Sequence, residues 1–593
     1  MSPGVRRGLS GLVGAAALIA AITIVSRLVG FGRWFAQSYA VGATATGTAY
    51  ATANQLPNVF FEVVAGGALA GAVVPLLAGP LAKNLRGDVD RIASALLTWA
   101  IAVCLPAAVL LGLLAHPLTE LLIGTPQHGE RAVSGATLDL AGHLLIVFAP
   151  QVVLYGIGVV LTGVLQAQRK FVWPAAAPLA SSVVVVASYL VFQSLAGEAV
   201  RNPAALSSDA IAWLGWGTTA GVAAMSLPLL IPVARSGVRL RPTFGFPPGV
   251  AVRARHLAVA GIGGLVAQQA AVLVIVWLAN GHGEHDGGTL NIFQYAQAVY
   301  FLPYAVLAVP LATAAFPRLA QHAATGDHAG YARLVALSTR AVLVVSAAGA
   351  AALVAAAPAV TAVFASIDAS KNVLAIAAMA PTLTVLAPGL LGYGLIFQLS
   401  RVLFALERGR AAVIAVATGW FTVVVASVLA VGAFAPRGGD GVGTLRGLAL
   451  GNTIGMTVAG MALLFAVWRS SGRGALSGTP RSLLVAVVGA AAGAIAGRWV
   501  VDAVLGLIDP GVLPAIVAGL GGAAVSALAV LVSVGVADRS TFSGVSNAGR
   551  GVAGTGSGSG SGTSSGSRTG SGPGSGTGTG SGSKAPKEEE PRA

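Results

Sequence analysis

The sequence has very little charge and almost no cysteine. Only 9% of its 593 residues are charged, and Cys104 is its single cysteine. One thiol forms neither an internal disulfide nor a cysteine-based metal site, and because Cys104 lies in an apolar run we expect a small buried thiol. Scarce charge, with 55% hydrophobic residues and a mean hydropathy of +0.81, predicts a polytopic membrane protein.

Acidic residues are also few, 20 against 35 basic residues, which gives a formal net charge of +15. The basic residues are scattered over many short loops instead of one face, so nucleic acid is not an expected partner. Thirty of the 35 are arginine, which suggests a high-GC genome. The sequence contains no Ser/His/Asp array, no nucleotide-binding motif and no soluble segment that could carry an active site. We therefore expect neither an enzyme nor a cofactor.

Fourteen stretches of the chain are apolar and long enough to cross a bilayer. They are residues 10–32, 47–80, 92–116, 136–166, 174–194, 210–234, 256–279, 289–320, 337–364, 373–405, 411–434, 444–468, 482–505 and 512–536. The first is too long for the apolar region of a signal peptide, so we interpret it as a transmembrane helix. Several of the others contain proline, at which we expect kinks. The sequence thus predicts an all-α polytopic membrane protein with 14 transmembrane helices.

The basic residues of the loops orient these helices. With the amino terminus inside, nineteen Lys and Arg side chains fall in inner loops and five in outer loops. The five are Arg131, Arg201, Lys371, Arg437 and Arg446. Basic residues within spans or at their edges are not counted, namely Arg27, Arg33, Arg340, Arg401 and Arg498. This positive-inside bias predicts that both termini lie in the cytoplasm.

The chain repeats itself weakly at an offset near 240 residues. Leu56-Pro57-Asn58 has a counterpart in Leu302-Pro303-Tyr304, and Gly163–Arg169 resembles Arg401–Arg408. Parallel repeats of this kind are common in transporters, with the substrate path between the two halves. We expect one six-helix lobe over residues 1–236, a second over 237–475, and two extra transmembrane helices over 476–539.

Residues 540–593 differ from the rest of the chain in composition. Gly, Ser and Thr repeat there without apolar partners, and the segment ends near Lys587-Glu588-Glu589-Glu590. Such a segment cannot bury a core, so we expect a disordered cytoplasmic tail. Both a passive extension and a docking site for a cytoplasmic partner remain open.

Two arginines lie in and just beyond the first apolar stretch, Arg27 within it and Arg33 after its end. A guanidinium near the bilayer centre costs about 2.5–3.5 kcal/mol, so it is normally kept where an anion or a watery cavity receives it. The alternative is that both side chains extend to the nearer headgroups. We interpret Arg27 and Arg33 as candidate binding residues for an anionic substrate.

Other polar residues of the spans have two interpretations. Seven amides lie in the second, seventh and eighth spans: Asn54, Gln55, Asn58, Gln268, Gln269, Gln294 and Gln297. They either line a cavity or join helices by hydrogen bonds, and Asn58 and Gln297 are favoured for the cavity. Asp139 with His143 form either a proton or cation site or, as we expect, interface polarity. The segment His282–Asp286 is expected to be a solvated turn, although its composition resembles a metal-binding tract.

Five sequence motifs resemble the MurJ (MviN) family of the multidrug/oligosaccharidyl-lipid/polysaccharide flippase superfamily. They are Ser26–Arg33, Leu56-Pro57-Asn58, Val74-Pro75-Leu76, Leu161–Ala167 and Leu302-Pro303-Tyr304, and Gly67-Ala68-Leu69 agrees with them. The similarity covers residues 8 to about 470, and the chain looks like a divergent, actinobacterial-type member. Members of this family move lipid II, the undecaprenyl-pyrophosphate-linked peptidoglycan precursor, from the inner to the outer leaflet.

The resemblance implies a V-shaped pair of six-helix lobes around a cationic cavity in a bacterial plasma membrane protein. Transport would proceed by alternating access, driven by an ion gradient or the membrane potential. Helices 13 and 14 would hold the polyprenyl tail, and the implied site contains Arg27, Arg33, Asn58, Glu62 and Gln297. Expected partners are lipid II or a related polyprenyl-pyrophosphate glycan, membrane lipids and cell-wall synthesis proteins, and we expect a monomer.

The sequence departs from the family pattern at three places. Glu62 follows two phenylalanines where the family usually carries basic residues, Thr48 replaces an acidic residue, and Ala298 replaces an arginine. An ion pair of Glu62 with Arg27 or Arg33 would offset the cost of insertion. These departures keep alternatives open: a flippase for another polyprenyl-linked glycan, a drug/cation antiporter, or a non-transporting membrane scaffold.

Overall fold

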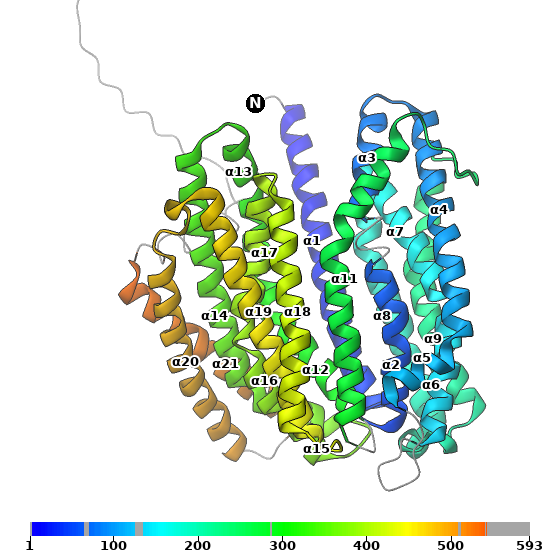
Figure 1. The fold of residues 1–593 in the computed structure, drawn as a ribbon, viewed down its shortest axis with the longest axis vertical. Coiled ribbons are helices and arrows are strands. Elements are labelled where there is room, and N and C mark those ends of the chain that lie inside the picture. Colours follow the sequence, from blue (N-terminus) through cyan, green and yellow to red (C-terminus); the bar gives the residue numbers. More distant parts are fainter. Residues whose placement is uncertain are drawn as a thin grey trace, which may run out of the picture. The chain divides into compact units, whose positions relative to one another are not determined.

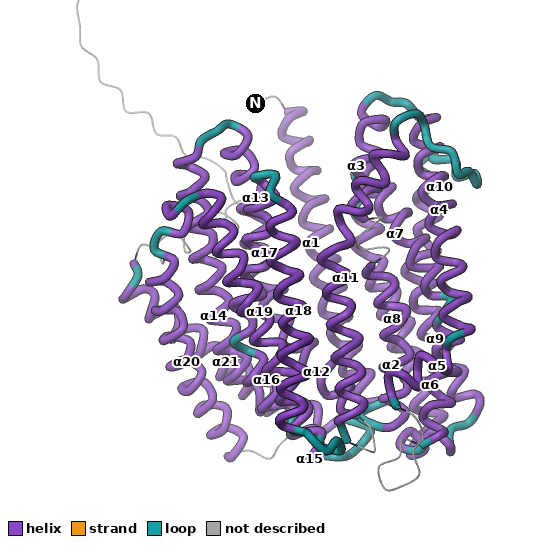
Figure 2. Tube along the Cα trace, viewed as in Figure 1, coloured by secondary structure: helices purple, strands orange, loops and turns teal. Residues whose placement is uncertain are grey.

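The computed structural model describes residues 3–63, 70–124, 134–284, 288–507, 511–539 and 541. Side chains are described within these ranges except at 3–20, 70–72, 253 and 255–263. The described residues contain helices and loops but no strand (Figure 2). The prediction of an all-α protein is therefore confirmed for this part of the chain.

The helices of residues 1–236, called the N-terminal half below, are mostly long and apolar. They are α1 (Pro3–Ala40), α2 (Ala45–Phe60), α3 (Ala70–Ala82), α4 (Arg86–Leu113), α5 (Ala115–Ile123), α6 (Gly135–Phe148), α7 (Gln151–Ala167), α8 (Val172–Ala196), α9 (Ser208–Ser226) and α10 (Leu230–Arg235) (Figure 1). Three short 3-10 turns belong to the same half: η2 (Gly197–Arg201), η3 (Pro203–Ala205) and η4 (Leu227–Leu229).

Residues 237–475, the C-terminal half, continue in the same manner. Its elements are α11 (Val250–His282), α12 (Thr289–Pro303), η5 (Tyr304–Ala308), α13 (Val309–Ala324), α14 (His328–Ile367), α15 (Val373–Ala377), α16 (Met379–Leu386), α17 (Gly389–Ala405), α18 (Gly409–Phe434), α19 (Gly441–Ser471) and the 3-10 turn η6 (Arg473–Leu476). The last two helices are α20 (Thr479–Leu507) and α21 (Val512–Ala537).

Eleven helical segments of the described chain are long and apolar enough to cross a membrane. A twelfth results if Val373–Leu386 and Gly389–Ala405, which meet at 53°, form one bent span. These twelve match the predicted stretches from 92–116 onwards, although α14 begins at His328, earlier than predicted. The first two predicted spans fall on α1 and on α2 with α3, where residues 64–69 lie outside the described part. The count of fourteen stays a prediction.

Proline interrupts two helices at corresponding points of the repeat. Pro57 lies in the last turn of α2 and is followed by a π-helical turn at 61–63. Pro303 ends α12 and is followed by η5, also a π-helical turn. Proline lacks an N–H and its ring displaces the preceding carbonyl, so the ladder of hydrogen bonds must shift there. The two halves therefore share a structural feature as well as a sequence motif.

The two halves meet at the end of the molecule that holds the α1–α2 turn, residues 41–44, called the turn end. One hydrophobic cluster there contains residues of both halves, such as Tyr50, Phe148, Phe293 and Phe364. At the amino-terminal end, where α1 begins, each half has a cluster of its own. Val73, Leu161 and Val233 belong to the N-terminal half, and Leu319, Leu399 and Val467 to the C-terminal half.

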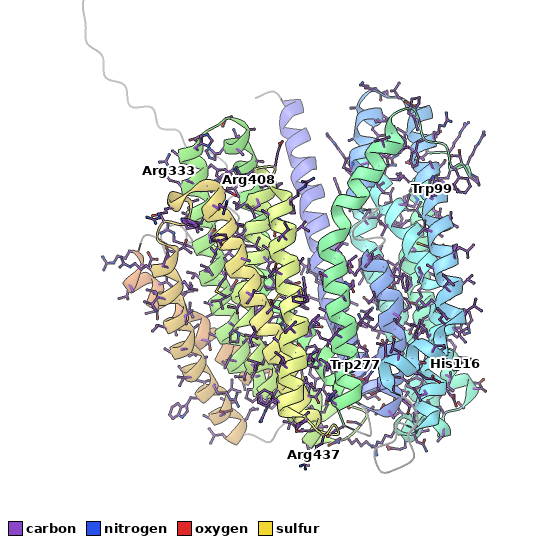
Figure 3. The ribbon with its side chains drawn as sticks, viewed as in Figure 1. Trp99, His116, Trp277, Arg333, Arg408 and Arg437 are labelled. Carbon is purple, nitrogen blue, oxygen red and sulfur yellow. The ribbon has the colours of Figure 1, made fainter. Side chains whose placement is uncertain are left out.

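Labelled arginines distinguish the same two ends. Arg333 and Arg408, which the sequence assigns to inner loops, lie toward the end where α1 begins (Figure 3). Arg437, assigned to an outer loop, lies at the opposite end. These three arginines therefore lie at the ends that the charge pattern predicts, while Arg131 lies outside the described residues.

Helices α20 and α21 pack closely because small residues face each other. Gly489, Gly493 and Gly497 are spaced by four along α20, and a Cβ on each would lie within 3.0 Å of α21 atoms. Small residues at this spacing let two backbones approach within a membrane. The pair also packs against α14, and a buried polar group at its end joins Ser482, Asp538 and Thr541, with Arg340 of α14 donating to the Thr541 hydroxyl at 3.1 Å. Thr541 thus lies in the fold, although it falls inside the predicted tail.

Asp327, in the loop before α14, caps that helix. Its carboxylate accepts the Gly330 N–H at 2.8 Å and contacts His322 Nδ1 at 2.9 Å. The Gly330 hydrogen bond, followed by His322, lowers the pKa of Asp327 below its ordinary value of 3.8. A lowered folded-state pKa stabilises the protein above the unfolded pKa, and the effect is lost as pH falls through the folded value.

We therefore expect Asp327→Ala to lower the melting temperature in detergent at neutral pH. The difference from the wild type should shrink as the pH falls below about 4. Asp88→Ala, at a half-buried position in the first turn of α4, is the control and should show a smaller difference. A difference for Asp327→Ala that stays constant down to about pH 2.5 would contradict the cap assignment.

Candidate functional site

The two arginines of α1 face different halves of the molecule. The helix is continuous from Pro3 to Ala40, so six residues place Arg27 and Arg33 about 120° apart. Arg33 is half-buried and interacts electrostatically with Tyr155 and Tyr189 of the N-terminal half. Arg27 is exposed and interacts with Tyr304 of the C-terminal half. Helix α1 therefore presents one arginine toward each half.

Neither arginine forms the ion pair with Glu62 that the sequence suggested. Among the described side chains, no carboxylate oxygen lies within 4.0 Å of either guanidinium. Glu62 lies in the π-helical turn after α2 and interacts electrostatically with Tyr155 and Tyr393 instead. The backbone hydrogen bonds change to the π-helical pattern after Pro57, which moves residues 61–63 away from regular α-helical positions. The sequence pattern did not predict this change.

Asn58 joins two helices of the N-terminal half. The Tyr155 hydroxyl donates to Asn58 Oδ1 at 3.0 Å, and Asn58 Nδ2 donates to the Asn54 carbonyl at 2.9 Å. The Phe61 ring also lies against Tyr155, with centroids 4.4 Å apart. These contacts between α2 and α7 support the helix-joining interpretation of Asn58. Gln297, half-buried on α12, has no hydrogen-bond partner among the described residues, which leaves its amide available to a ligand.

A cluster of aromatic residues in the C-terminal half surrounds an arginine that sequence reasoning gave no role. Tyr304 of η5 packs edge-on against Tyr393 and Phe397, with centroids 4.7 and 5.5 Å apart. The guanidinium of Arg401 lies 4.0 Å from the centroid of Phe397, and it donates to the Thr313 hydroxyl at 2.7 Å. The sequence contained an indication of this cluster: Tyr393, Phe397 and Arg401 are spaced by four residues, which puts them on one face of α17.

Asp368 links the two halves at the turn end. It is only 4% exposed, and it accepts the Ser38 hydroxyl at 2.6 Å and the Ala43 N–H at 3.0 Å, both from the N-terminal half. The Ser370 N–H adds a third bond at 2.9 Å. A buried carboxylate with this many donors is stabilised without a cation.

Two threonines of α2 add further links between the halves. Thr48 accepts the Gly288 N–H at 2.7 Å, and Thr52 accepts the Asn280 side-chain amide at 2.9 Å. Gly288 has a φ of +91°, and a Cβ there would lie 2.5 Å from the Ala43 carbonyl oxygen, so only glycine allows this approach. Thr48, noted in the sequence as a departure from the family pattern, thus contributes to the closure of the turn end.

The remaining polar candidates form no site in the described part of the chain. Asp139 and His143 are both exposed on α6, and no group of three His, Cys, Asp or Glu residues there could hold a metal ion. His285 and Asp286 lie outside the described residues, as does Gly67-Ala68-Leu69. Cys104 is free and buried, as predicted.

Comparison with known proteins identifies the family. Residues 37–519 match the family described as "Lipid II flippase MurJ". The chain belongs to the MurJ family. A "Probable lipid II flippase MurJ" of Rhizobium tropici is 26% identical over 308 residues, which are 51% of this chain and 54% of that protein. The chain aligns with about half the length of the curated relatives it matches.

Solved structures agree with the MurJ assignment at the level of the fold. A structure titled "Lipid II flippase MurJ, inward closed conformation" has a TM-score of 0.67 at 18% identity, over 88% of this chain and 99% of that one. An inward-facing MATE transporter of the MOP superfamily has a TM-score of 0.59 at 14% identity, over 77% and 98% of the two chains. MurJ proteins are bacterial inner-membrane transporters, which confirms the prediction of a membrane transporter family rather than an enzyme family.

Loss of the Asp368 carboxylate should open the turn end of this MurJ-family protein. Asp368→Ala removes the acceptor of two bonds between the halves, worth about 1–3 kcal/mol together. Val41, which is fully buried in the turn, can be replaced by cysteine in a Cys104→Ser background. In the purified protein we expect Asp368→Ala to raise the maleimide labelling rate of that cysteine about tenfold.

The control is Asp440→Ala. Asp440 accepts the Gly443 N–H at 2.8 Å within the C-terminal half and makes no side-chain bond to the N-terminal half among the described residues. Its substitution should leave the labelling rate unchanged. Equal labelling rates in the Asp368 and Asp440 variants would show that Asp368 does not hold the halves together.

Proposed function

We propose that this protein flips lipid II from the inner to the outer leaflet of the bacterial plasma membrane by alternating access. One observation carries the proposal: α1 bears two guanidiniums, one toward each half, and no described carboxylate pairs with either. Membership of the MurJ family supports the choice of substrate. Arg27 and Arg33 are the headgroup-binding residues, and Gln297 and Glu62 complete the polar surface.

The chemistry of the substrate accounts for these residues. A pyrophosphate-linked sugar-peptide headgroup cannot cross hydrocarbon without a polar, positively charged path. Arginine binds phosphate oxygens through two parallel, charge-assisted hydrogen bonds. An arginine already paired with Glu62 would have fewer donors to offer, so the absence of that pair favours anion binding. Glu62 lowers the net positive charge of the region and is a candidate for proton or cation coupling.

The proposed topology has fourteen spans with both termini in the cytoplasm. Twelve candidate spans are described, and α1 and the α2–α3 segment supply the remaining two. The turn end then faces outward, so the joined turn end and the separate cores at the amino-terminal end correspond to an inward-facing state. The two six-helix lobes over residues 1–236 and 237–475 would rock about the turn end. Helices α20 and α21 would provide the surface for the polyprenyl tail.

A depletion experiment tests the proposed function. In a bacterium depleted of its own lipid II flippase, this protein should restore lipid II on the outer leaflet, measured with an impermeant lipid II probe. Arg27→Ala and Arg33→Ala should each reduce the flipping rate by about tenfold or more, since a hydrogen bond to a charged group contributes about 1.5–3 kcal/mol.

The matched control is Arg498→Ala, at an exposed arginine of α20 that pairs with Asp502 at 3.0 Å. It should flip as the wild type does. No rescue by well-expressed wild-type protein would reject lipid II and leave another polyprenyl-linked glycan, a drug/cation antiporter or a scaffold. Rescue that survives both α1 substitutions would reject the binding role of the arginines.

The tail should be dispensable for transport. A chain that ends after Thr541 keeps the buried hydroxyl that contacts Ser482 and Asp538, and we expect it to flip lipid II at the wild-type rate. A chain that ends at Asp538 loses that hydroxyl and should have a lower melting temperature. Loss of flipping on removal of residues 542–593 alone would assign the tail an active role.

A further inference from the structure

Arg401 is held in a defined position within the C-terminal half. Its guanidinium lies over the ring of Phe397, one helical turn earlier on α17, and donates to Thr313 of α13. A side chain that extended to the headgroups would point past the end of α17 at Ala405. Arg401 instead folds back along its own helix, so simple extension to the nearer membrane surface does not explain its conformation.

The face of α17 that carries Arg401 also carries Tyr393, which packs against the hydrophobic cluster that the two halves share. Tyr393 and Phe397 share this face, and Glu62 of the N-terminal half interacts electrostatically with Tyr393. Tyr304, which packs on both rings, interacts with Arg401 and also with Arg27 of α1. Tyr304 also packs against the hydrophobic cluster that the two halves share, so the aromatic group beside Arg401 borders the N-terminal half.

The contacts of Arg401 leave most of its donors available. The guanidinium has five N–H groups, and the Thr313 hydroxyl accepts a bond from only one terminal nitrogen. No described carboxylate lies within 4.0 Å of it. Stacking on an aromatic ring orients the planar group without using its hydrogen-bonding edges. A fixed, unpaired guanidinium suits an anion with two oxygens at adjacent positions, such as a phosphate group.

We propose that Arg401 is the anion-binding residue of the C-terminal half, and that it and Arg27 bind the diphosphate of the lipid-linked substrate from opposite sides. The assignment rests on the proposed function for its substrate class. The eighth span of this chain carries Ala298 in place of the arginine of the family pattern. Arg401 supplies a positive charge to the headgroup from the same half. Phe397 and Thr313 act as positioning residues for the guanidinium.

Binding of defined lipids to the purified full chain tests this inference. Undecaprenyl diphosphate, undecaprenol and inorganic diphosphate are the three probes, with binding measured by native mass spectrometry and by competition. Arg401→Ala should weaken binding of undecaprenyl diphosphate about tenfold or more and leave undecaprenol unchanged. Arg401→Lys should retain part of the affinity. If inorganic diphosphate competes with undecaprenyl diphosphate and the competition depends on Arg401, the protein recognises the anion alone. If inorganic diphosphate does not compete, the lipid is also required.

Arg408→Ala is the matched control, because Arg408 also donates to a hydroxyl, that of Ser470 at 3.1 Å, but lies outside α17. It should bind undecaprenyl diphosphate as the wild type does. Arg401→Gln keeps a polar, hydrogen-bonding side chain but removes the positive charge, so it tests the inference if the alanine variant fails to fold. Wild-type affinity in folded Arg401→Gln or Arg401→Ala would overturn the inference.

The flipping and binding measurements together distinguish a failure of the Arg401 inference from a failure of the proposed function. If the wild type flips lipid II and the Arg401 variants flip and bind equally well, the inference fails and the proposed function stands. If the wild type does not flip lipid II but binds undecaprenyl diphosphate through Arg401, the proposed substrate fails and the anion site stands.

Discussion

No water reaches the hydrocarbon core of a bilayer, so every polar group that this chain places there needs a partner within the protein. This constraint explains why the described residues form helices and no strands. It also explains the π-helical turns after Pro57 and Pro303, where the backbone exchanges one set of hydrogen bonds for another instead of leaving carbonyls exposed. Some hydroxyls follow the same rule: Thr119 and Thr361 donate hydrogen bonds to carbonyls of the preceding turn.

The same constraint makes each intramembrane charge informative. The ion pair of Glu198 with Lys371 lies on an exposed surface, whereas Arg27, Arg33 and Arg401 have no carboxylate partner within 4.0 Å among the described residues. Arg401 lies over the ring of Phe397 instead, which lowers the cost of its guanidinium through the negative face of the ring. Guanidiniums within membrane spans that lack counter-ions are costly unless an anionic ligand binds them. This energetic imbalance is the physical basis of the proposed transport of a diphosphate.

The two halves are joined in a way that permits movement. At the turn end they share a hydrophobic cluster and a few hydrogen bonds centred on Asp368, while at the other end their cores are separate. A small set of bonds worth a few kcal/mol can be exchanged for another set at the opposite end. Alternating access requires two such arrangements of similar free energy, and a chain whose halves shared one continuous core could not provide them.

Periodicity, length and charge determined much of this protein from the sequence alone. The apolar stretches predicted the twelve described spans, with ends that differ by up to nine residues. The charge of the loops predicted the ends at which Arg333, Arg408 and Arg437 lie. The motifs of the first, second and eighth spans predicted the MurJ family. These features are readable because a bilayer imposes the same hydrophobic length on every helix, independently of its neighbours.

The tertiary structure alone decided which side chains meet. Sequence reasoning paired Glu62 with the arginines of α1, but the turn after Pro57 directs Glu62 to Tyr155 and Tyr393. It favoured a cavity role for Asn58, whose amide is bonded to Tyr155, and it set Arg401 aside as a residue near the edge of a span. Asp368, in a loop far along the chain, became the link between the halves. Such contacts depend on helix rotation and on local changes of helical pitch, which hydrophobic patterning does not encode.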